Sequence, residues 1–161
     1  MMGTHNTYTN TNPTTIGDTA VDGLLAGIGG GLLMMLFLII ATSFLSETPL
    51  TLLAKFDPSN GNSWLQGLLS HLAVSTIYGL LYAVGLVMLS FVWPAVKRLG
   101  WAIGLLFGLC LGLIGRGWLL PLTDSALLEI PAVLFMTAHL LYGLVLGILI
   151  MRRLKHSPYE S

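Results

Sequence analysis

Five ionisable side chains lie in or beside stretches of the sequence that are otherwise apolar: His71, Arg116, Asp124, Glu129 and His139. Ionisable groups within a membrane are rare, and each is a candidate for function. Neutral imidazole is a good axial ligand for haem iron, and a guanidinium pairs well with a propionate. His71, His139 and Arg116 are therefore the candidate cofactor-binding residues, with haem b held between the two histidines.

Other interpretations of the histidines stay open. Opposed axial ligands lie at similar depth, whereas the two histidines differ by about 3 to 9 Å in the predicted spans, at about 1.5 Å per residue. A single histidine could instead ligate haem or a chlorin. Alternatively, each histidine hydrogen-bonds a neighbouring carbonyl or a hydroxyl (Ser70, Ser75, Thr137 or a facing tyrosine) and helps to set helix register.

Arg116 also has two interpretations. It could form an ion pair with Asp124 or Glu129, which follow within one link and lie on the same side of the membrane. It could instead bind a lipid phosphate or the head group of a quinone. Cys110 lies in the middle of an apolar segment and is expected to be structural.

Three tyrosines accompany these charged residues: Tyr78, Tyr82 and Tyr142. Their rings could line a ligand pocket, although membrane helices often use tyrosine hydroxyls merely as donors to a neighbouring helix. The sequence does not separate these two roles.

Composition places the chain in a membrane. Hydrophobic residues make up 55% of its 161 residues and charged residues only 9%, and its mean hydropathy is +0.83. A soluble domain carries about a quarter charged residues. Seven basic and seven acidic residues give no net charge, so a nucleic-acid partner is not expected.

The sequence also lacks patterns typical of enzymes and of metal centres. No cluster has zinc-ligand spacing, no phosphate-binding or nucleophile-elbow motif is present, and no carboxylate pair is placed for acid–base work. All seven acids lie in tails, links or the ends of spans, whereas a proton-coupled exporter is expected to carry one deep in a span. We therefore expect a protein without catalytic or metal-binding residues.

Four apolar segments are each long enough to cross about 30 Å of hydrocarbon. Residues 1–17, rich in Thr and Asn, form a polar tail that lacks the features of a cleavable signal peptide, and residues 18–161 form the membrane part. The predicted spans are 23–45, 65–93, 99–120 and 130–151.

Local signals place the ends of these spans. Asp18 or Asp22 could cap the first span, and Ser63 with Gln66 has the spacing of a capping box before the second. Pro131 is tolerable in the first turn of the fourth. Residues 49–56 are expected to form a short helix in the outer interface.

Basic residues in the links predict the orientation. Lys97 and Arg98 lie between the second and third spans, and Arg152, Arg153 and Lys155 follow the fourth. Because basic residues favour the cytoplasmic side, both termini are expected in the cytoplasm of a bacterial or archaeal cell, with the protein in the inner membrane.

Glycines recur at four-residue intervals, which places them in one row along a helix face. Such rows let helices approach closely in a membrane. The second and fourth spans carry matching small residues around Tyr78 and Tyr142, so the chain is predicted to use one helical hairpin twice, in parallel orientation. We expect the rows of the first and third spans to join near the bundle centre. The packing glycines are Gly23, Gly27 and Gly31, then Gly100, Gly104, Gly108 and Gly112, and finally Gly143 and Gly147.

The glycine-rich first span and the last-span motif H-x-x-Y-G-x-x-x-G, from His139 to Gly147, resemble small four-span membrane proteins of bacteria and archaea without an assigned function. The resemblance covers the membrane part but not the polar tail. It implies a four-span fold and carries no catalytic residues to this chain. The second span departs from the motif, because Ser75 stands where His139 would align.

The sequence therefore predicts an all-α transmembrane four-helix bundle built from two similar hairpins. The first functional hypothesis is a non-catalytic accessory subunit of a larger electron-transport or photosynthetic complex, with other membrane subunits and lipids as partners. Alternatives are a haem- or quinone-binding subunit that uses His71, His139 and Arg116, and a small transporter or lipid-binding module that acts through Arg116.

Overall fold

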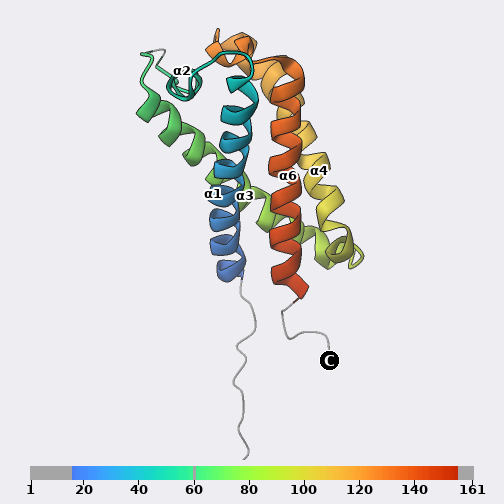
Figure 1. The fold of residues 1–161 in the computed structure, drawn as a ribbon. Coiled ribbons are helices and arrows are strands. Elements are labelled where there is room, and N and C mark those ends of the chain that lie inside the picture. The colour runs from blue at the N-terminus through green and yellow to red at the C-terminus, as the bar shows by residue number, and fades with distance from the viewer. Residues whose placement is uncertain (1–15, 60, 156–161) are drawn as a thin grey trace, which may run out of the picture.

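The computed structural model describes residues 16–59 and 61–155, in which four long helices dominate. The chain runs up α1, down α3, up α4 and down α6 (Figure 1). Their bounds are Ile16–Ser43 for α1, Trp64–Val92 for α3, Val96–Ile114 for α4 and Ala132–Lys155 for α6. In this part of the chain, four stretches are long and apolar enough to cross a membrane: 17–43, 64–92, 98–122 and 132–153. The expected all-α, multi-pass bundle is confirmed.

Shorter helices connect the long ones at one end of the bundle. The helix expected near residues 49–56 is α2, Pro49–Ala54. After α4 come a π-helical turn, η1 (Gly115–Leu119), a short α5 (Leu120–Leu122) and a 3-10 turn, η2 (Ala126–Glu129). Pro121 explains the π turn, because proline lacks an N–H and its ring crowds the preceding turn.

The capping box predicted at the start of α3 has only one of its two expected hydrogen bonds. The Ser63 hydroxyl accepts a hydrogen bond from the backbone N–H of Gln66 and begins α3. In a capping box, the Gln66 side chain would bind the Ser63 N–H. That N–H instead donates to the Asp57 carboxylate, at 3.0 Å. A loop aspartate therefore replaces half of the box.

The predicted role of Asp22 as a cap is wrong. Helix α1 already begins at Ile16, so Asp22 lies inside it and pairs with Arg153 of α6 at 3.5 Å. Asp18 lies in the first turn of α1. Pro131 immediately precedes α6, and its carbonyl accepts the Phe135 N–H. Residues 1–15 of the predicted polar tail lie outside the described residues.

The glycine row of α1 packs against α3. A Cβ added to Gly23 would lie 2.6 Å from the Cβ of Ala83, and one on Gly27 would lie 2.5 Å from the carbonyl oxygen of Ser75. Real Cβ atoms do not approach other atoms so closely. The two backbones therefore touch over this row, and only glycine fits there.

The glycine row of α4 packs in the same way against α6. A Cβ on Gly147 would lie 2.5 Å from the carbonyl oxygen of Gly100, and one on Gly104 would meet the Gly143 carbonyl. Further along, Gly108 meets the backbone of His139. Gly31 and Gly112 complete the two rows against Ser75 and against Met136 with His139.

The expectation that the first and third spans join through their glycine rows is therefore wrong. Each row finds its complement in the next membrane helix of its own hairpin, where small residues also stand four apart. The contacts of Gly27 with Ser75 and of Gly108 with His139 match the predicted alignment of the two hairpins. The repeat itself stays a prediction.

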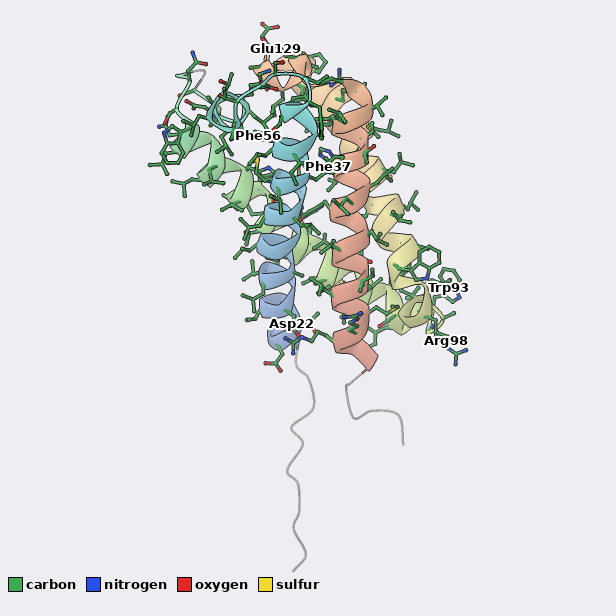
Figure 2. All side chains as sticks on the ribbon, viewed as in Figure 1. Asp22, Phe37, Phe56, Trp93, Arg98 and Glu129 are labelled. Atoms are coloured by element: carbon green, nitrogen blue, oxygen red, sulfur yellow. The ribbon has the colours of Figure 1, made fainter. Side chains whose placement is uncertain are left out.

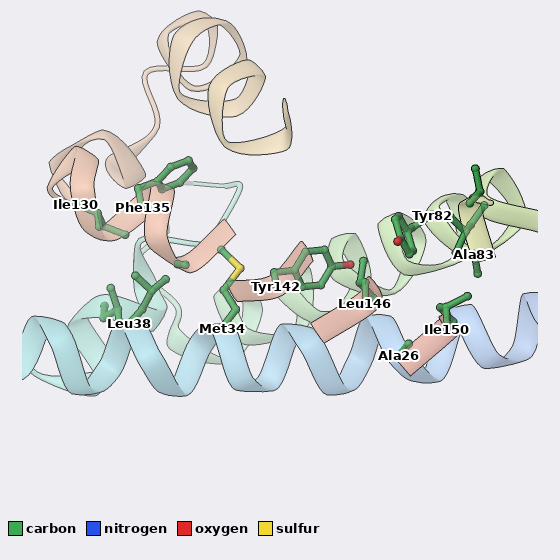
Figure 3. Close-up of a cluster of buried hydrophobic side chains, with 14 residues drawn as sticks. Ala26, Met34, Leu38, Tyr82, Ala83, Ile130, Phe135, Tyr142, Leu146 and Ile150 are labelled. Atoms are coloured by element: carbon green, nitrogen blue, oxygen red, sulfur yellow. The ribbon is translucent and has the colours of Figure 1, made fainter. Parts of the chain in front are cut away.

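The hydrophobic core lies largely between α1 and α6, which join the two hairpins. Figure 3 shows Met34 and Leu38 of α1 on one side, with Phe135, Tyr142 and Leu146 of α6 on the other. These five side chains are buried, at 5% exposure or less. Large apolar residues elsewhere on the four helices face outward, as expected of a surface in lipid.

Charged residues lie at the two ends of the bundle. Asp22 and Arg98 lie at one end, together with the uncharged Trp93, and Glu129 lies at the opposite end (Figure 2). The basic link and the basic end of α6 thus share one end, as the loop charges require. Which end faces the cytoplasm stays a prediction.

Candidate functional site

A cavity of about 270 Å³ lies in the half of the bundle nearer Glu129. All four long helices line it, together with the turns that follow α4. Among its lining residues are Met34 of α1, Phe56 of the loop after α2, His71 and Tyr78 of α3, and His139 and Tyr142 of α6. The cavity is therefore mainly apolar, lined by aliphatic and aromatic side chains, with a few polar groups.

The cavity opens between α3 and α4. These helices meet at the opposite end, where the Tyr82 hydroxyl donates to the Gly100 carbonyl at 2.6 Å, and α3 then tilts away from α4 (Figure 1). The lining residues Val74, Ile114 and Leu119 are 49%, 48% and 43% exposed. An apolar mouth on the side of a membrane bundle gives access from the lipid.

His71 is held across the contact between α1 and α3. Its side chain is buried, and its Nε2 lies 3.0 Å from the carbonyl oxygen of Gly31. The edge of the Phe56 ring packs against the imidazole, with the ring centroids 4.9 Å apart. Because Gly31 has no side chain, α3 comes close enough for this bond.

His139 is held within its own helix. Its Nδ1 lies 2.9 Å from the carbonyl oxygen of Phe135, one turn earlier in α6, and the two rings are 4.3 Å apart. One interpretation from the sequence was that each histidine bonds a neighbouring carbonyl or a hydroxyl. The partners are the carbonyls of Gly31 and Phe135 and not the side chains that it named.

The other polar groups of the cavity also bond backbone carbonyls. The Tyr142 hydroxyl donates to the Ser75 carbonyl and so joins α6 to α3. The Ser75 hydroxyl donates to the His71 carbonyl at 2.7 Å, and the Ser70 hydroxyl to the Phe56 carbonyl at 2.6 Å. Within the described chain, the Tyr78 hydroxyl makes no hydrogen bond. Tyr142 thus has both roles considered for the tyrosines, whereas Tyr82 only joins helices.

Arg116 lies near the cavity but does not line it. Its guanidinium donates to the carbonyl of Ile130 at 2.8 Å and to that of Leu128 at 3.3 Å. It also lies over the Phe135 ring, 5.8 Å from the centroid. The Phe135 ring thus contacts both Arg116 and His139. Of the three predicted site residues, only the two histidines line the cavity.

The predicted ion pair of Arg116 with Asp124 or Glu129 is wrong. Glu129 instead contacts Lys55 at 3.1 Å, and Lys55 also contacts Glu47 at 2.6 Å. Lys55 follows directly on α2, which lies across this end of the bundle, and sequence reasoning missed it. Burial lowers the pKa of Lys55, but its hydrogen bonds to Glu47 and Glu129 outweigh burial and raise the pKa above its usual value.

The cavity is small compared with haem or a chlorin. Its volume of about 270 Å³ lies below the range of roughly 300–1,000 Å³ usual for sites of drug-sized ligands, and these macrocycles are larger than such ligands. Arg116, the expected partner of a propionate, donates instead to the backbone. Among the described residues, no group of three or more histidines, cysteines or acids could hold a metal ion. Cys110 lies on the outer surface of α4.

Comparisons of the chain with protein-family models, with curated proteins and with solved structures found no match. The cavity therefore has to be interpreted from its own chemistry.

Proposed function

We propose that this protein is a non-catalytic membrane binding protein that takes a small apolar molecule with a polar end from the bilayer into the cavity beside His71 and His139. The observation that carries the proposal is the combination of an apolar mouth between α3 and α4 with polar side chains deeper inside. Ligand sites are typically apolar clefts with a few polar groups that fix orientation. A cavity left empty would instead weaken the packing of the bundle.

Blocking the mouth tests this proposal. Val74→Trp places a large ring at the opening, whereas Leu81→Trp places the same ring two turns along the same face of α3, away from the cavity. Each variant is purified in mild detergent, and the small molecules that stay bound are extracted and identified by mass spectrometry. We expect a bound molecule that Val74→Trp removes and Leu81→Trp keeps. Equal retention by both variants would contradict the proposal.

A different observation favours a role as an accessory subunit of a larger membrane complex. The glycine rows pack within the chain, but Gly29 and Gly85 face open space on the outside of α1 and α3. Small outward residues let another membrane helix approach. Gly29→Leu and Gly85→Leu should then release any subunit that co-purifies with the wild-type protein, and co-purification unchanged by both would count against this role.

A further inference from the structure

Apart from Tyr78, the polar side chains of the cavity share one property, which is that their hydrogens are already engaged by backbone carbonyls. A carbonyl oxygen can only accept a hydrogen bond. The nitrogen of His71 that contacts Gly31 and the nitrogen of His139 that contacts Phe135 must therefore each carry the proton. In each neutral imidazole, the other nitrogen has a lone pair and no hydrogen.

The hydroxyls follow the same rule. Ser70, Ser75 and Tyr142 each donate their one hydrogen to a backbone carbonyl, which leaves only oxygen lone pairs for a ligand. Tyr78 is the exception among these polar side chains, because its hydroxyl is unpaired within the described chain and can donate or accept. The cavity thus offers several acceptors and one group able to donate.

We propose that the ligand of this cavity is a neutral apolar ring that bears a hydroxyl group, such as a phenol or a hydroquinone. The inference rests on the proposed binding function. A hydroxyl can donate to the lone pair of either histidine while its oxygen accepts from Tyr78, and it brings no charge into an apolar site. The rings of Phe56, Phe135 and Tyr142 match an aromatic body.

The same chemistry disfavours the ligands expected from the sequence. The oxygens of an oxidised quinone and of a lipid phosphate can only accept, and Arg116, the donor foreseen for them, does not line the cavity, so Tyr78 is the one donor that they would meet there. A buried acceptor that meets another acceptor leaves both unpaired, which costs affinity. The cavity therefore discriminates between an alcohol and its ether, and between a hydroquinone and its quinone.

Two matched pairs of probes test this inference on the full chain in nanodiscs. The first pair is 4-butylphenol and 4-butylanisole, which share a carbon skeleton and differ in the donor hydrogen. The second is tetramethylhydroquinone and tetramethylbenzoquinone, handled without oxygen. Binding is measured by calorimetry, and we expect the hydroxyl member of each pair to bind roughly three- to tenfold more tightly, as one neutral hydrogen bond allows. A fifth probe, 4-butylcyclohexanol, shows whether the ring must be aromatic, and binding as tight as that of the phenol would overturn the aromatic assignment.

Variants connect the preference to the histidines. His71→Phe and His139→Phe keep a ring in place and remove the two imidazole acceptors, so the combined variant should prefer the phenol over its ether less strongly than wild type does. Ser90→Ala, on the same helix as His71 but outside the cavity, should keep the wild-type preference.

The failures of the two proposals are distinct. If the wild-type protein binds the phenol and the ether equally, and Val74→Trp abolishes the binding of both, the cavity is a binding site without a preference for a hydroxyl group. The donor inference is then wrong and the proposed binding function stands. If Val74→Trp leaves the binding of every probe unchanged, the cavity is not the site and both proposals fail.

Discussion

Arg116 supplies two hydrogen bonds to carbonyls at the turn between η2 and α6. The carbonyls of Leu128 and Ile130 lie before the start of α6, so they take no part in its hydrogen bonds. A guanidinium presents several donors in a fixed plane, so one side chain can hold two carbonyls in this turn. At the residue scale, the role of Arg116 is therefore to stabilise the backbone turn beside the cavity.

Replacing Arg116 by Gln should therefore lower the free energy of unfolding by about 1 to 2 kcal/mol, since hydrogen bonds from charged groups contribute roughly 1.5 to 3 kcal/mol and one of these two is exposed. Unfolding in mixed micelles with increasing SDS measures the loss. Arg116→Lys should recover only part, because an ammonium lacks the planar fork. Retention of a cavity ligand should not change in either variant. Lost retention with unchanged stability would instead support direct binding by Arg116.

Asp57 holds the loop between α2 and α3, outside the membrane-spanning stretches. Its carboxylate accepts hydrogen bonds from the hydroxyl and backbone N–H of Ser59, at 2.7 and 2.9 Å, and from the N–H of Ser63. The hydrogen bond from the Ser59 hydroxyl, followed by those from the two N–H groups, lowers the pKa of Asp57 below its usual value of 3.8.

A lowered pKa in the folded state means that Asp57 stabilises the loop fully above about pH 4, and that this stabilisation is lost as the pH falls through the lower folded value. Asp57→Asn should thus be less stable than wild type at pH 7, and the difference should shrink below pH 4. Hydrogen exchange at the N–H of Ser63 across this range measures the effect. A difference that stays constant with pH would show that ionisation of Asp57 is irrelevant.

At the element scale, the glycine rows decide which helices pair. In the absence of a hydrophobic driving force within lipid, helices associate through close packing. The rows of α1 and α4 bring each helix into backbone contact with α3 and α6 respectively. The close contact of α1 and α3 also lets His71 hydrogen-bond the carbonyl of Gly31. The glycine row of α1 therefore helps to fix the orientation of a side chain that lines the cavity.

Gly104→Ala should destabilise the bundle by about 1 to 3 kcal/mol, because its new methyl group would press on the backbone of Gly143 and overpacking costs that much. Gly85→Ala is the matched control, since no atom lies within 4 Å of the position of its Cβ. Gly85→Ala should raise the free energy of unfolding by about 0.4 to 1 kcal/mol, because alanine has less backbone freedom than glycine in the unfolded chain. Thermal unfolding in detergent compares them, and an equal response would mean that the close contact is unimportant.

At the scale of the whole molecule, the excess of basic residues at one end of the bundle predicts the orientation in the membrane. Arg98 lies at one end with Asp22, and Glu129 lies at the other (Figure 2). Basic residues favour the cytoplasmic side, so the end with the cavity should face outward.

Single cysteines test this orientation in a Cys110→Ser background. Asp124→Cys should react with a membrane-impermeant maleimide in intact cells, whereas Arg98→Cys should react only after permeabilisation, because both positions are exposed but lie on opposite sides. The reverse pattern would invert the topology, and the cavity would then open near the cytoplasmic surface.

The membrane character and the four spans followed from the sequence, because long apolar runs and local caps such as Ser63 depend only on neighbouring residues. Glycine spacing likewise showed that some helices touch at their backbones. It could not show which ones, since every glycine row suits any other. Only the tertiary structure decided that Gly27 meets Ser75 and Gly108 meets His139.

The site divides in the same way. His71 and His139 were identified from the sequence, because an ionisable residue in an apolar run is conspicuous. Three features depend on residues far apart in the chain: the hydrogen bond of His71 to Gly31, the pairing of Glu129 with Lys55 instead of Arg116, and the contact of Phe56 with His71. The partner of His139, the carbonyl of Phe135, is only one helical turn away. The hydrogen bonds of the cavity residues determine what the cavity can bind, because a hydrogen that is donated to a backbone carbonyl is no longer available to a ligand.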